Sequence, residues 1–359
     1  MKRISKRFNR FGFSLLLLAM FLFAGALPVS ARIYGGWGGR SSPSSGKTVG
    51  TYAVGTNPQG IAIDSSGNVW VANNGSGNGS GNNVTELNFS GKTVGTYAVG
   101  TGPVGIAIDS SGNVWVTNGG SNNVTELNSS GKTVGTYAVG TEPQGIAIDS
   151  SGNVWVTNAG SRNGSGSNVT ELNSFGATVG TYAAGAGPNG IAIDSSGNVW
   201  VTNFESGKVT ELNSSGKTVG TYAVGTEPQG IAIDSSGNVW VANLRSNNVT
   251  ELNSSGKTVG TYAVGTNPVG IAIDSSGNVW VANSGSNNVT ELNSSGTTVN
   301  TYAVGGNPVG IAIDSSGNVW VTNSGSNTVT VIKPAKGPVI GPHGPHFHHY
   351  SGPRWLKPL

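Results

Sequence analysis

Short runs of β-branched and aromatic residues alternate with clusters of Gly, Asn, Ser, Asp and Pro between residues 46 and 333. In the first unit of this pattern, apolar runs cover residues 48–54, 61–63, 69–72 and 84–87. Runs of this composition bounded by turn residues predict β-strands. No window carries a helical spacing of apolar residues longer than one turn. The pattern therefore predicts an all-β fold built from units of four short strands.

The unit repeats seven times, as its single Trp shows at positions 70, 115, 155, 200, 240, 280 and 320. The spacings between these Trp residues are 45, 40, 45, 40, 40 and 40 residues. Four strands in about forty residues correspond to one propeller blade. We therefore predict a seven-bladed β-propeller with four-stranded antiparallel blades, in which the Trp side chains fill the gaps between blades.

The two ends of the repeat region predict how the ring closes. The Thr-Tyr strand opens the repeats at residues 47–54, before any Ile-Ala-Ile strand, and the last unit stops at Ile332 without a Thr-Tyr strand of its own. The N-terminal strand can therefore complete the last blade. Such pairing removes two exposed sheet edges, which would otherwise promote aggregation.

The segments outside the repeats differ from them in composition. Residues 1–31 have a basic start, an apolar run and a small-residue end, which predict a secretory signal peptide; an uncleaved membrane anchor is the alternative. Residues 32–45 are rich in Gly and Ser and predict a flexible linker. Residues 46–333 form the propeller, and the Pro- and Gly-rich residues 334–359 predict a disordered tail. We expect a protein that is secreted, periplasmic or on the cell surface.

The charge and the cysteine content of the chain exclude several classes of binding partner and of chemistry. Five of the 19 basic residues and none of the 16 acidic residues lie in residues 1–31, so removal of this segment leaves a net charge of −2. A sparsely charged propeller has no basic surface for nucleic acid. The chain has no Cys, which excludes disulfides and thiol catalysis. We expect a monomer without a cofactor, and without membrane contact after signal cleavage.

The recurring acidic residues are interpreted as structural. The Asp of each Asp-Ser-Ser-Gly-Asn segment, first at Asp64, lacks the further oxygen ligands of a calcium loop and is expected to accept backbone hydrogen bonds in a turn. The Glu of the fourth run, first at Glu86, recurs in six units and is expected to be solvated. The four His residues fall in the tail, where clustered imidazoles can bind Ni, Cu or Zn; an unstructured tail is the favoured interpretation for His343, His346, His348 and His349.

The segment Pro58-Gln-Gly-Ile-Ala-Ile-Asp-Ser-Ser-Gly-Asn-Val-Trp-Val-Ala-Asn73 resembles the NHL-type repeat of extracellular propellers. It is also similar to the repeat of the streptogramin B (virginiamycin B) lyase family, and the end of the last unit is similar to the YVTN family of surface propellers. The resemblance spans residues 46–333. It implies a propeller fold and a lyase that uses a catalytic His and acidic metal-binding residues. Since residues 46–333 contain no His, the implied catalytic residue has no counterpart.

Differences between the units locate a candidate binding surface. Two of the four turn types are nearly invariant, and propeller geometry places the other two together on the opposite face. One variable loop contains five-residue insertions near Gly75 and Arg162. Charged and apolar replacements, with Phe204 and Leu244 expected to be exposed, concentrate in units three to five at Glu142, Arg162, Phe204, Glu205, Lys208, Glu227, Leu244 and Arg245.

Three hypotheses follow from this distribution. The leading one is a secreted, non-enzymatic propeller that binds an extracellular protein or glycan through the variable loops, because binding residues favour loops on a rigid scaffold. The second is a lyase of the streptogramin B type, and the third is a structural repeat protein whose loops vary by neutral drift.

Overall fold

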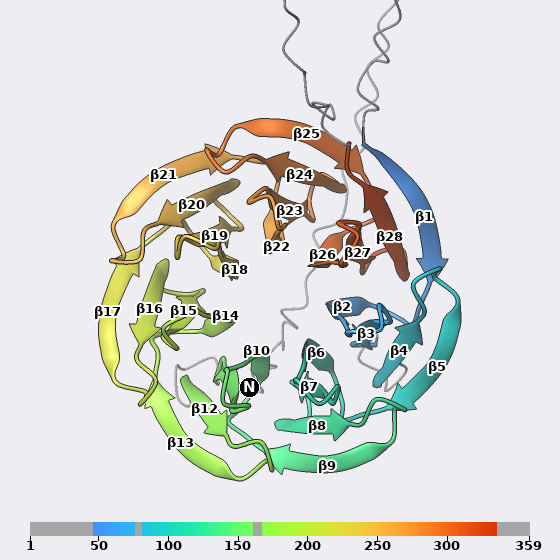
Figure 1. The fold of residues 1–359 in the computed structure, drawn as a ribbon. Coiled ribbons are helices and arrows are strands. Elements are labelled where there is room, and N and C mark those ends of the chain that lie inside the picture. Colours follow the sequence, from blue (N-terminus) through green and yellow to red (C-terminus); the bar gives the residue numbers. More distant parts are fainter. Residues whose placement is uncertain (1–45, 76–80, 161–166, 336–359) are drawn as a thin grey trace, which may run out of the picture. The chain divides into compact units, whose positions relative to one another are not determined.

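A computed structural model describes residues 46–75, 81–160 and 167–335. These residues form a ring of seven four-stranded antiparallel sheets around a central channel (Figure 1). Blades 1 to 6 consist of consecutive strands, from β2-β3-β4-β5 in blade 1 to β22-β23-β24-β25 in blade 6. Blade 7 has the order β26-β27-β28-β1. The predicted fold class is therefore confirmed, including the number of blades and the sheet type.

Each of the four strand types recurs once in every blade. The innermost strands are β2 (Pro58–Ile63), β6 (Pro103–Ile108), β10 (Pro143–Ile148), β14 (Pro188–Ile193), β18 (Pro228–Ile233), β22 (Pro268–Ile273) and β26 (Pro308–Ile313). The second strands are β3 (Val69–Asn73), β7 (Val114–Asn118), β11 (Val154–Asn158), β15 (Val199–Asn203), β19 (Val239–Asn243), β23 (Val279–Asn283) and β27 (Val319–Asn323). The third strands are β4 (Asn83–Leu87), β8 (Asn123–Leu127), β12 (Asn168–Leu172), β16 (Lys208–Leu212), β20 (Asn248–Leu252), β24 (Asn288–Leu292) and β28 (Thr328–Lys333). The outermost strands are β5 (Thr93–Ala98), β9 (Thr133–Ala138), β13 (Thr178–Ala183), β17 (Thr218–Ala223), β21 (Thr258–Ala263), β25 (Thr298–Ala303) and β1 (Lys47–Ala53).

The N-terminal strand closes the ring. β1 pairs antiparallel with β28, placing Lys47 opposite Lys333 and Tyr52 opposite Val329. Tyr52 stacks on Trp320 with ring centroids 6.0 Å apart. The predicted pairing of the two ends of the repeat region is confirmed, and it leaves blade 7 with the same number of strands as every other blade.

The core lies between neighbouring blades, where the Trp side chains were predicted. Trp70 is fully buried and packs with Val114, Val116 and Leu127 of the next blade. Trp320 of blade 7 packs in the same way against blade 1. All seven Trp side chains are 2% exposed or less, so each blade contributes its largest side chain to the next junction.

The repeated Asp holds the hairpin between the first two strands. Asp64 Oδ1 accepts hydrogen bonds from the backbone N–H groups of Ser66 (2.9 Å) and Asn68 (2.8 Å). Asp64 Oδ2 accepts one from Trp70 Nε1 (3.1 Å). Gly67 takes the left-handed backbone conformation that the turn requires, with φ +83°. The turn interpretation is confirmed, and the same carboxylate also satisfies the buried indole.

The described part of the chain contains no helix long and apolar enough to cross a membrane. The predicted signal peptide and linker lie outside the described residues, as does the tail from residue 336 onward, so the four His residues are also outside them.

Candidate functional site

The loops that vary between units lie together on one face, which we call the variable face. It consists of the loops between second and third strands, such as β3–β4, and the loops that join one blade to the next, such as β1–β2. Hydrogen bonds connect the two loop types: the backbone N–H groups of Asn74 and Gly75 donate to the backbone carbonyls of Asn57 (3.1 Å) and Thr56 (3.0 Å). The hairpins of the β2–β3 and β4–β5 types form the opposite face, which we call the turn face.

Seven of the eight predicted site residues are within the described residues. Glu142, Glu205, Lys208 and Arg245 are exposed, and Glu227 is half-buried. Phe204 and Leu244 are also half-buried, so the expectation that both are exposed is wrong. Arg162 falls in residues 161–166, outside the described residues.

In blade 5 the structure brings three of these residues together. Arg245 Nε donates to Glu227 Oε2 at 3.1 Å, an ion pair whose side chains are 62% and 29% exposed. The backbone N–H of Leu244 donates to the Glu227 carbonyl (3.1 Å). The pair therefore links the β17–β18 loop to the β19–β20 loop, although an exposed pair of this kind adds at most about 1 kcal/mol to stability.

Two of the site residues adopt a backbone conformation that their side chains disfavour. Glu142 and Glu227 have φ values of +51° and +54°. In the other blades the equivalent position holds Asn or Gly, which tolerate positive φ well. A Glu in this region is uncommon, and residues kept in disfavoured conformations cluster at functional sites.

Each innermost strand begins with Pro, and the residue that follows it was not among the site residues predicted from the sequence. This second residue is Gln144, Asn189 and Gln229 in blades 3 to 5, and Gln59 in blade 1. It is Val104, Val269 and Val309 in blades 2, 6 and 7. The signal was present in the sequence, because this position holds an amide residue in four units and Val in the other three.

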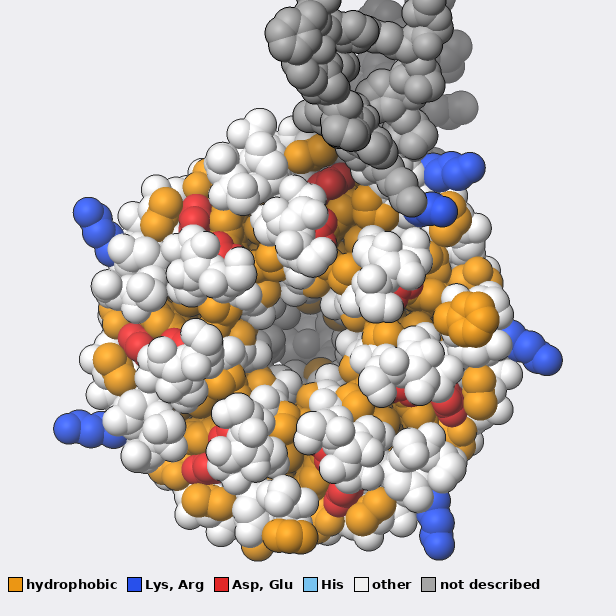
Figure 2. Space-filling model, viewed as in Figure 1, with side chains coloured by type: hydrophobic (Ala, Val, Ile, Leu, Met, Phe, Trp, Pro, Cys, Tyr) orange, Lys and Arg blue, Asp and Glu red, His pale blue; other side chains and the backbone are white. Residues whose placement is uncertain are grey.

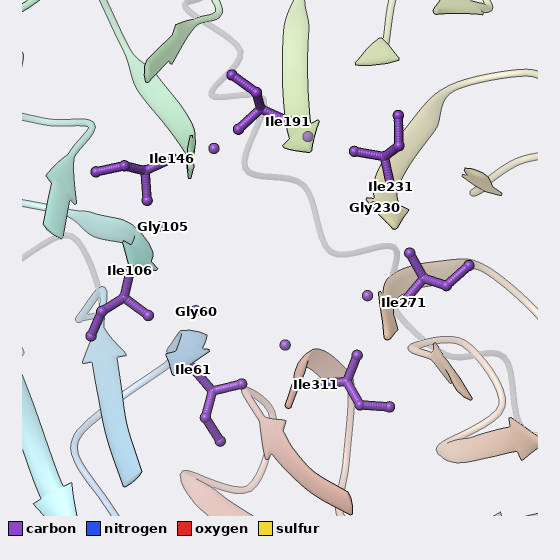
Figure 3. A pocket seen from close by; sticks show the side chains of 14 residues that line it. Gly60, Ile61, Gly105, Ile106, Ile146, Ile191, Gly230, Ile231, Ile271 and Ile311 are labelled. Carbon is purple, nitrogen blue, oxygen red and sulfur yellow. The ribbon is translucent and has the colours of Figure 1, made fainter. Parts of the chain in front are cut away.

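The cavity in the central channel is lined by Gly and Ile residues. Seven Gly-Ile pairs, one from each innermost strand, surround a cavity of about 210 Å³. Figure 3 shows the Ile side chains of all seven blades arranged around it, from Ile61 to Ile311. Polar recognition at the channel therefore depends on residues at its ends.

The repeated Glu side chains of the third strands are buried, contrary to expectation. Glu86 is 4% exposed, and its Oε2 accepts a hydrogen bond from Tyr97 OH at 2.7 Å. The prediction that these Glu side chains are solvated is wrong, because Tyr97 on the outermost strand folds back across Gly95 and covers the carboxylate. Burial raises the pKa of Glu86, the hydrogen bond from Tyr97 lowers it in part, and the charge of Asp64 raises it further.

The Glu-Tyr pair recurs in six blades, and blade 7 has Val331 instead. Burial and the neighbouring carboxylate raise the pKa of Tyr97 to about 12. Identical pairs in six blades give no single site with distinct acid and base roles. No group of three or more His, Cys, Asp or Glu side chains suited to a metal ion occurs in residues 46–75, 81–160 and 167–335.

The turn face is more regular. Exposed lysines precede the outermost strands of blades 1, 2, 4 and 5, and Figure 2 shows basic side chains spaced around the rim beside β5, β9, β17 and β21. Two side chains break the regularity: Phe89 and Phe175, in the β4–β5 and β12–β13 turns, are 75% and 84% exposed. They lie in separate blades, and single exposed apolar side chains are common on soluble proteins.

Comparison with known proteins gives a family and a fold. A family model described as the virginiamycin B lyase family matches residues 88–340. A streptogramin B lyase structure is similar with a TM-score of 0.70 and 21% identity over 79% of this chain and 96% of that chain. A catalytically inactive histidine-to-alanine variant of virginiamycin B lyase from Staphylococcus aureus, crystallised with quinupristin, has a TM-score of 0.69 and 20% identity over 79% and 99% of the two chains.

A similar fold also occurs in a protein that is not described as a lyase. Hydrazine synthase of Kuenenia stuttgartiensis is similar with a TM-score of 0.71 and 19% identity, over 79% of this chain and 97% of that chain. No curated protein is significantly similar in sequence. At these identities the structural likenesses show the propeller fold alone.

Proposed function

The chain belongs to the virginiamycin B lyase family, and we propose that it is a secreted propeller that binds an extracellular protein or glycan through the variable face of blades 3 to 5, without catalysing a reaction. The observation that carries this proposal is the break in symmetry at this arc. There the repeated Asn, Gly and Ser positions are replaced by charged and large side chains, and two Glu residues are held at positive φ.

The rigidity of the ring supports a binding role. The loops of this arc leave strands of four-stranded sheets, and the second strand of each sheet is buried, so the loops are presented on a fixed frame. Arg and Phe are among the residues enriched at protein interfaces, and the surrounding Glu and Lys side chains would set orientation and association rate.

Two double variants test the proposal. We expect Phe204→Ala with Arg245→Ala to weaken binding of a captured partner by about 2 kcal/mol or more, because it removes an aromatic and a basic anchor. The matched control on the turn face, Ser66→Ala with Lys132→Ala, should leave binding unchanged. Binding is measured by calorimetry, with circular dichroism to check the fold. Equal effects from both pairs, or none from the first, would show that the loop differences are neutral drift.

Secretion is the second part of the proposal, and it rests on the signal-like composition of residues 1–31. Expression of the full chain in a bacterial host, followed by fractionation and N-terminal sequencing, tests it. We expect a mature chain that begins after residue 31, outside the cytoplasm. A full-length chain retained in the membrane would favour the anchor instead.

Membership of the family favours a second candidate function, a carbon–oxygen lyase acting on streptogramin B antibiotics. Against it stands the composition of residues 46–333, which include no His to act as a general base. The test is incubation of the purified protein with a streptogramin B antibiotic, with and without EDTA. Turnover that EDTA abolishes would establish the lyase and overturn the non-enzymatic proposal.

A further inference from the structure

Two positions change together at every junction between blades. One is the fourth residue of the second strand, either Thr or Ala, and the other is the residue after Pro in the next blade. Thr is followed by an amide at Thr117/Gln144, Thr157/Asn189, Thr202/Gln229 and Thr322/Gln59, and Ala is followed by Val at Ala72/Val104, Ala242/Val269 and Ala282/Val309. All seven junctions obey this pairing, so the polar and apolar junctions are two distinct types.

At the polar junctions a buried hydroxyl joins the innermost strands of two blades. Thr157 Oγ1 donates to the backbone carbonyl of Asn189 in the next blade (2.6 Å) and accepts from the backbone N–H of Gly145 in its own blade (2.8 Å). Thr117 and Thr202 make the same two contacts. Strands β10, β14 and β18 are therefore fixed at the point where the amide residues begin them.

These three amide residues form a continuous arc. Gln144, Asn189 and Gln229 begin the innermost strands of blades 3, 4 and 5, at the end of the channel that opens on the variable face. All three are half-buried, and Gln144 Nε2 donates to the backbone carbonyl of Glu142 at 3.3 Å. Glu142 and Glu227 lie two residues before Gln144 and Gln229, so the arc is bordered by the two Glu residues with positive φ.

From this juxtaposition we propose that the amide arc of blades 3 to 5 is a binding site for a neutral oligosaccharide. The inference rests on the proposed binding function and names its ligand. Each amide side chain offers both a donor and an acceptor, and each carboxylate offers acceptors, which together match the hydroxyl groups of a sugar. An anionic ligand is disfavoured by the carboxylate of Glu142, which would repel it, while the carboxylate of Glu227 is already paired with Arg245.

The distribution of apolar side chains favours a sugar over a protein. Protein interfaces depend on large apolar and aromatic anchors. The large hydrophobic residues that are exposed in the described part of the chain lie elsewhere, on the outermost strands and in the β4–β5 and β12–β13 turns. On the arc, Phe204 and Leu244 are half-buried, and polar side chains make up the accessible surface around them.

The repeats supply the replacement residue for the variants, and the Thr of each preceding blade keeps its hydrogen-bond partner because that partner is a backbone carbonyl. Gln144→Val with Gln229→Val places in blades 3 and 5 the residue found in blades 2, 6 and 7. Gln59→Val makes the same change in blade 1, at a polar junction outside the arc. The probes are neutral hexose and N-acetylhexosamine oligosaccharides, titrated by calorimetry into the full-length protein.

We expect at least one of these oligosaccharides to bind, the double variant to weaken binding by about tenfold or more, and Gln59→Val to change it less than about twofold. If the double variant fails to fold, nuclear magnetic resonance of the wild-type protein decides, because the side-chain amide signals of Gln144, Asn189 and Gln229 should shift on addition of sugar and that of Gln59 should not.

Two results overturn the site: no binding by any oligosaccharide of the panel, or equal loss in the double variant and in Gln59→Val. A protein partner whose binding depends on Phe204 and Arg245 but not on Gln144 and Gln229 would overturn the sugar site and leave the proposed binding function standing.

Discussion

At the scale of single residues, the two Glu side chains at positive φ show a local conflict between sequence and backbone. The turn before each innermost strand requires the left-handed region in every blade, and Asn57, Gly102, Gly187, Asn267 and Asn307 meet this requirement. Glu142 and Glu227 adopt the same conformation at a cost, since residues other than Gly, Asn and Asp are disfavoured there.

Replacing Glu142 with Asn should therefore stabilise the protein. We expect Glu142→Asn to raise the free energy of unfolding by about 0.5–1 kcal/mol, because Asn tolerates positive φ without adding the backbone entropy of Gly. The reverse change at an equivalent turn, Asn267→Glu, should lower it by a similar amount. Denaturant unfolding measures both. A Glu142→Asn protein no more stable than the parent would mean that the carboxylate makes a compensating interaction.

The Glu-Tyr pairs give the protein a defined response to alkaline pH. Burial raises the pKa of Tyr97, Tyr137, Tyr182 and Tyr222 to about 12, and that of Tyr262 likewise, from an ordinary value of 10.0. A group whose pKa is raised on folding contributes stability that is fully present below its unfolded pKa. That stability is lost as the pH rises toward the folded pKa.

We therefore expect the free energy of unfolding to be maintained up to about pH 10 and to fall between pH 10 and about 12. Ultraviolet absorbance of phenolate should show these tyrosines ionising late in the folded protein and near pH 10 in concentrated guanidinium. Glu126→Gln should lower the pKa of Tyr137 alone, since it removes the adjacent negative charge. Ionisation of all tyrosines near pH 10 without unfolding would contradict the burial of the pairs.

At the scale of strands and junctions, the Thr hydroxyl is the group that joins neighbouring innermost strands at the polar junctions. Thr157 is fully buried. If its hydroxyl were removed, water could not take its place as the hydrogen-bond partner of the two backbone groups that it contacts. Leaving a buried donor or acceptor without a partner costs about 1–3 kcal/mol, which is more than a surface hydrogen bond contributes.

Thr157→Val should thus lower the free energy of unfolding by about 1–3 kcal/mol, because Val keeps the shape of Thr and loses the hydroxyl. Thr157→Ser, which keeps the hydroxyl and loses a methyl group, should cost less. Thermal and denaturant unfolding of the two variants provide the measurement. Equal destabilisation by Val and Ser would assign the effect to packing instead of hydrogen bonding.

Strands were the part of the structure that the sequence predicted best. Each strand type occurs seven times with nearly the same flanking turn residues. The seven copies therefore support one another in assigning each strand. The burial of Glu86 was missed because it depends on how Tyr97 crosses Gly95, and strand periodicity does not report on the path of a side chain. The amide residues are visible in the sequence, but their grouping into one arc was missed because it depends on the contact between one blade and the next.

At the scale of the whole molecule, closure by β1 makes the two ends of the repeat region depend on each other. Without β1, blade 7 would expose the edge of β28, and the stacked rings of Tyr52 and Trp320 would be lost. Exposed sheet edges are templates for aggregation.

Deleting residues 46–55 should consequently cause aggregation or a large loss of thermal stability, measured by light scattering and calorimetry. The control is a circular permutant in which this strand is moved behind Lys333. There a short hairpin can connect it, because Lys47 already lies opposite Lys333. The permutant should be as stable as the parent. A truncated protein that remains monomeric with an unchanged melting temperature would disprove closure by this strand.

The position of β1 in the chain also has a consequence for the time course of synthesis. β1 is translated first among the strands, and its partner β28 is translated last, roughly 275 residues later. At about 5–20 residues per second, the ribosome needs on the order of 15–60 s to produce that partner. Throughout this interval the nascent chain holds an unpaired strand at one end and an unfinished stack of blades at the other. A chain that ends before β28 cannot close the ring. Closure therefore occurs only after the final blade has been translated, and prematurely terminated chains keep an open ring that proteases can attack.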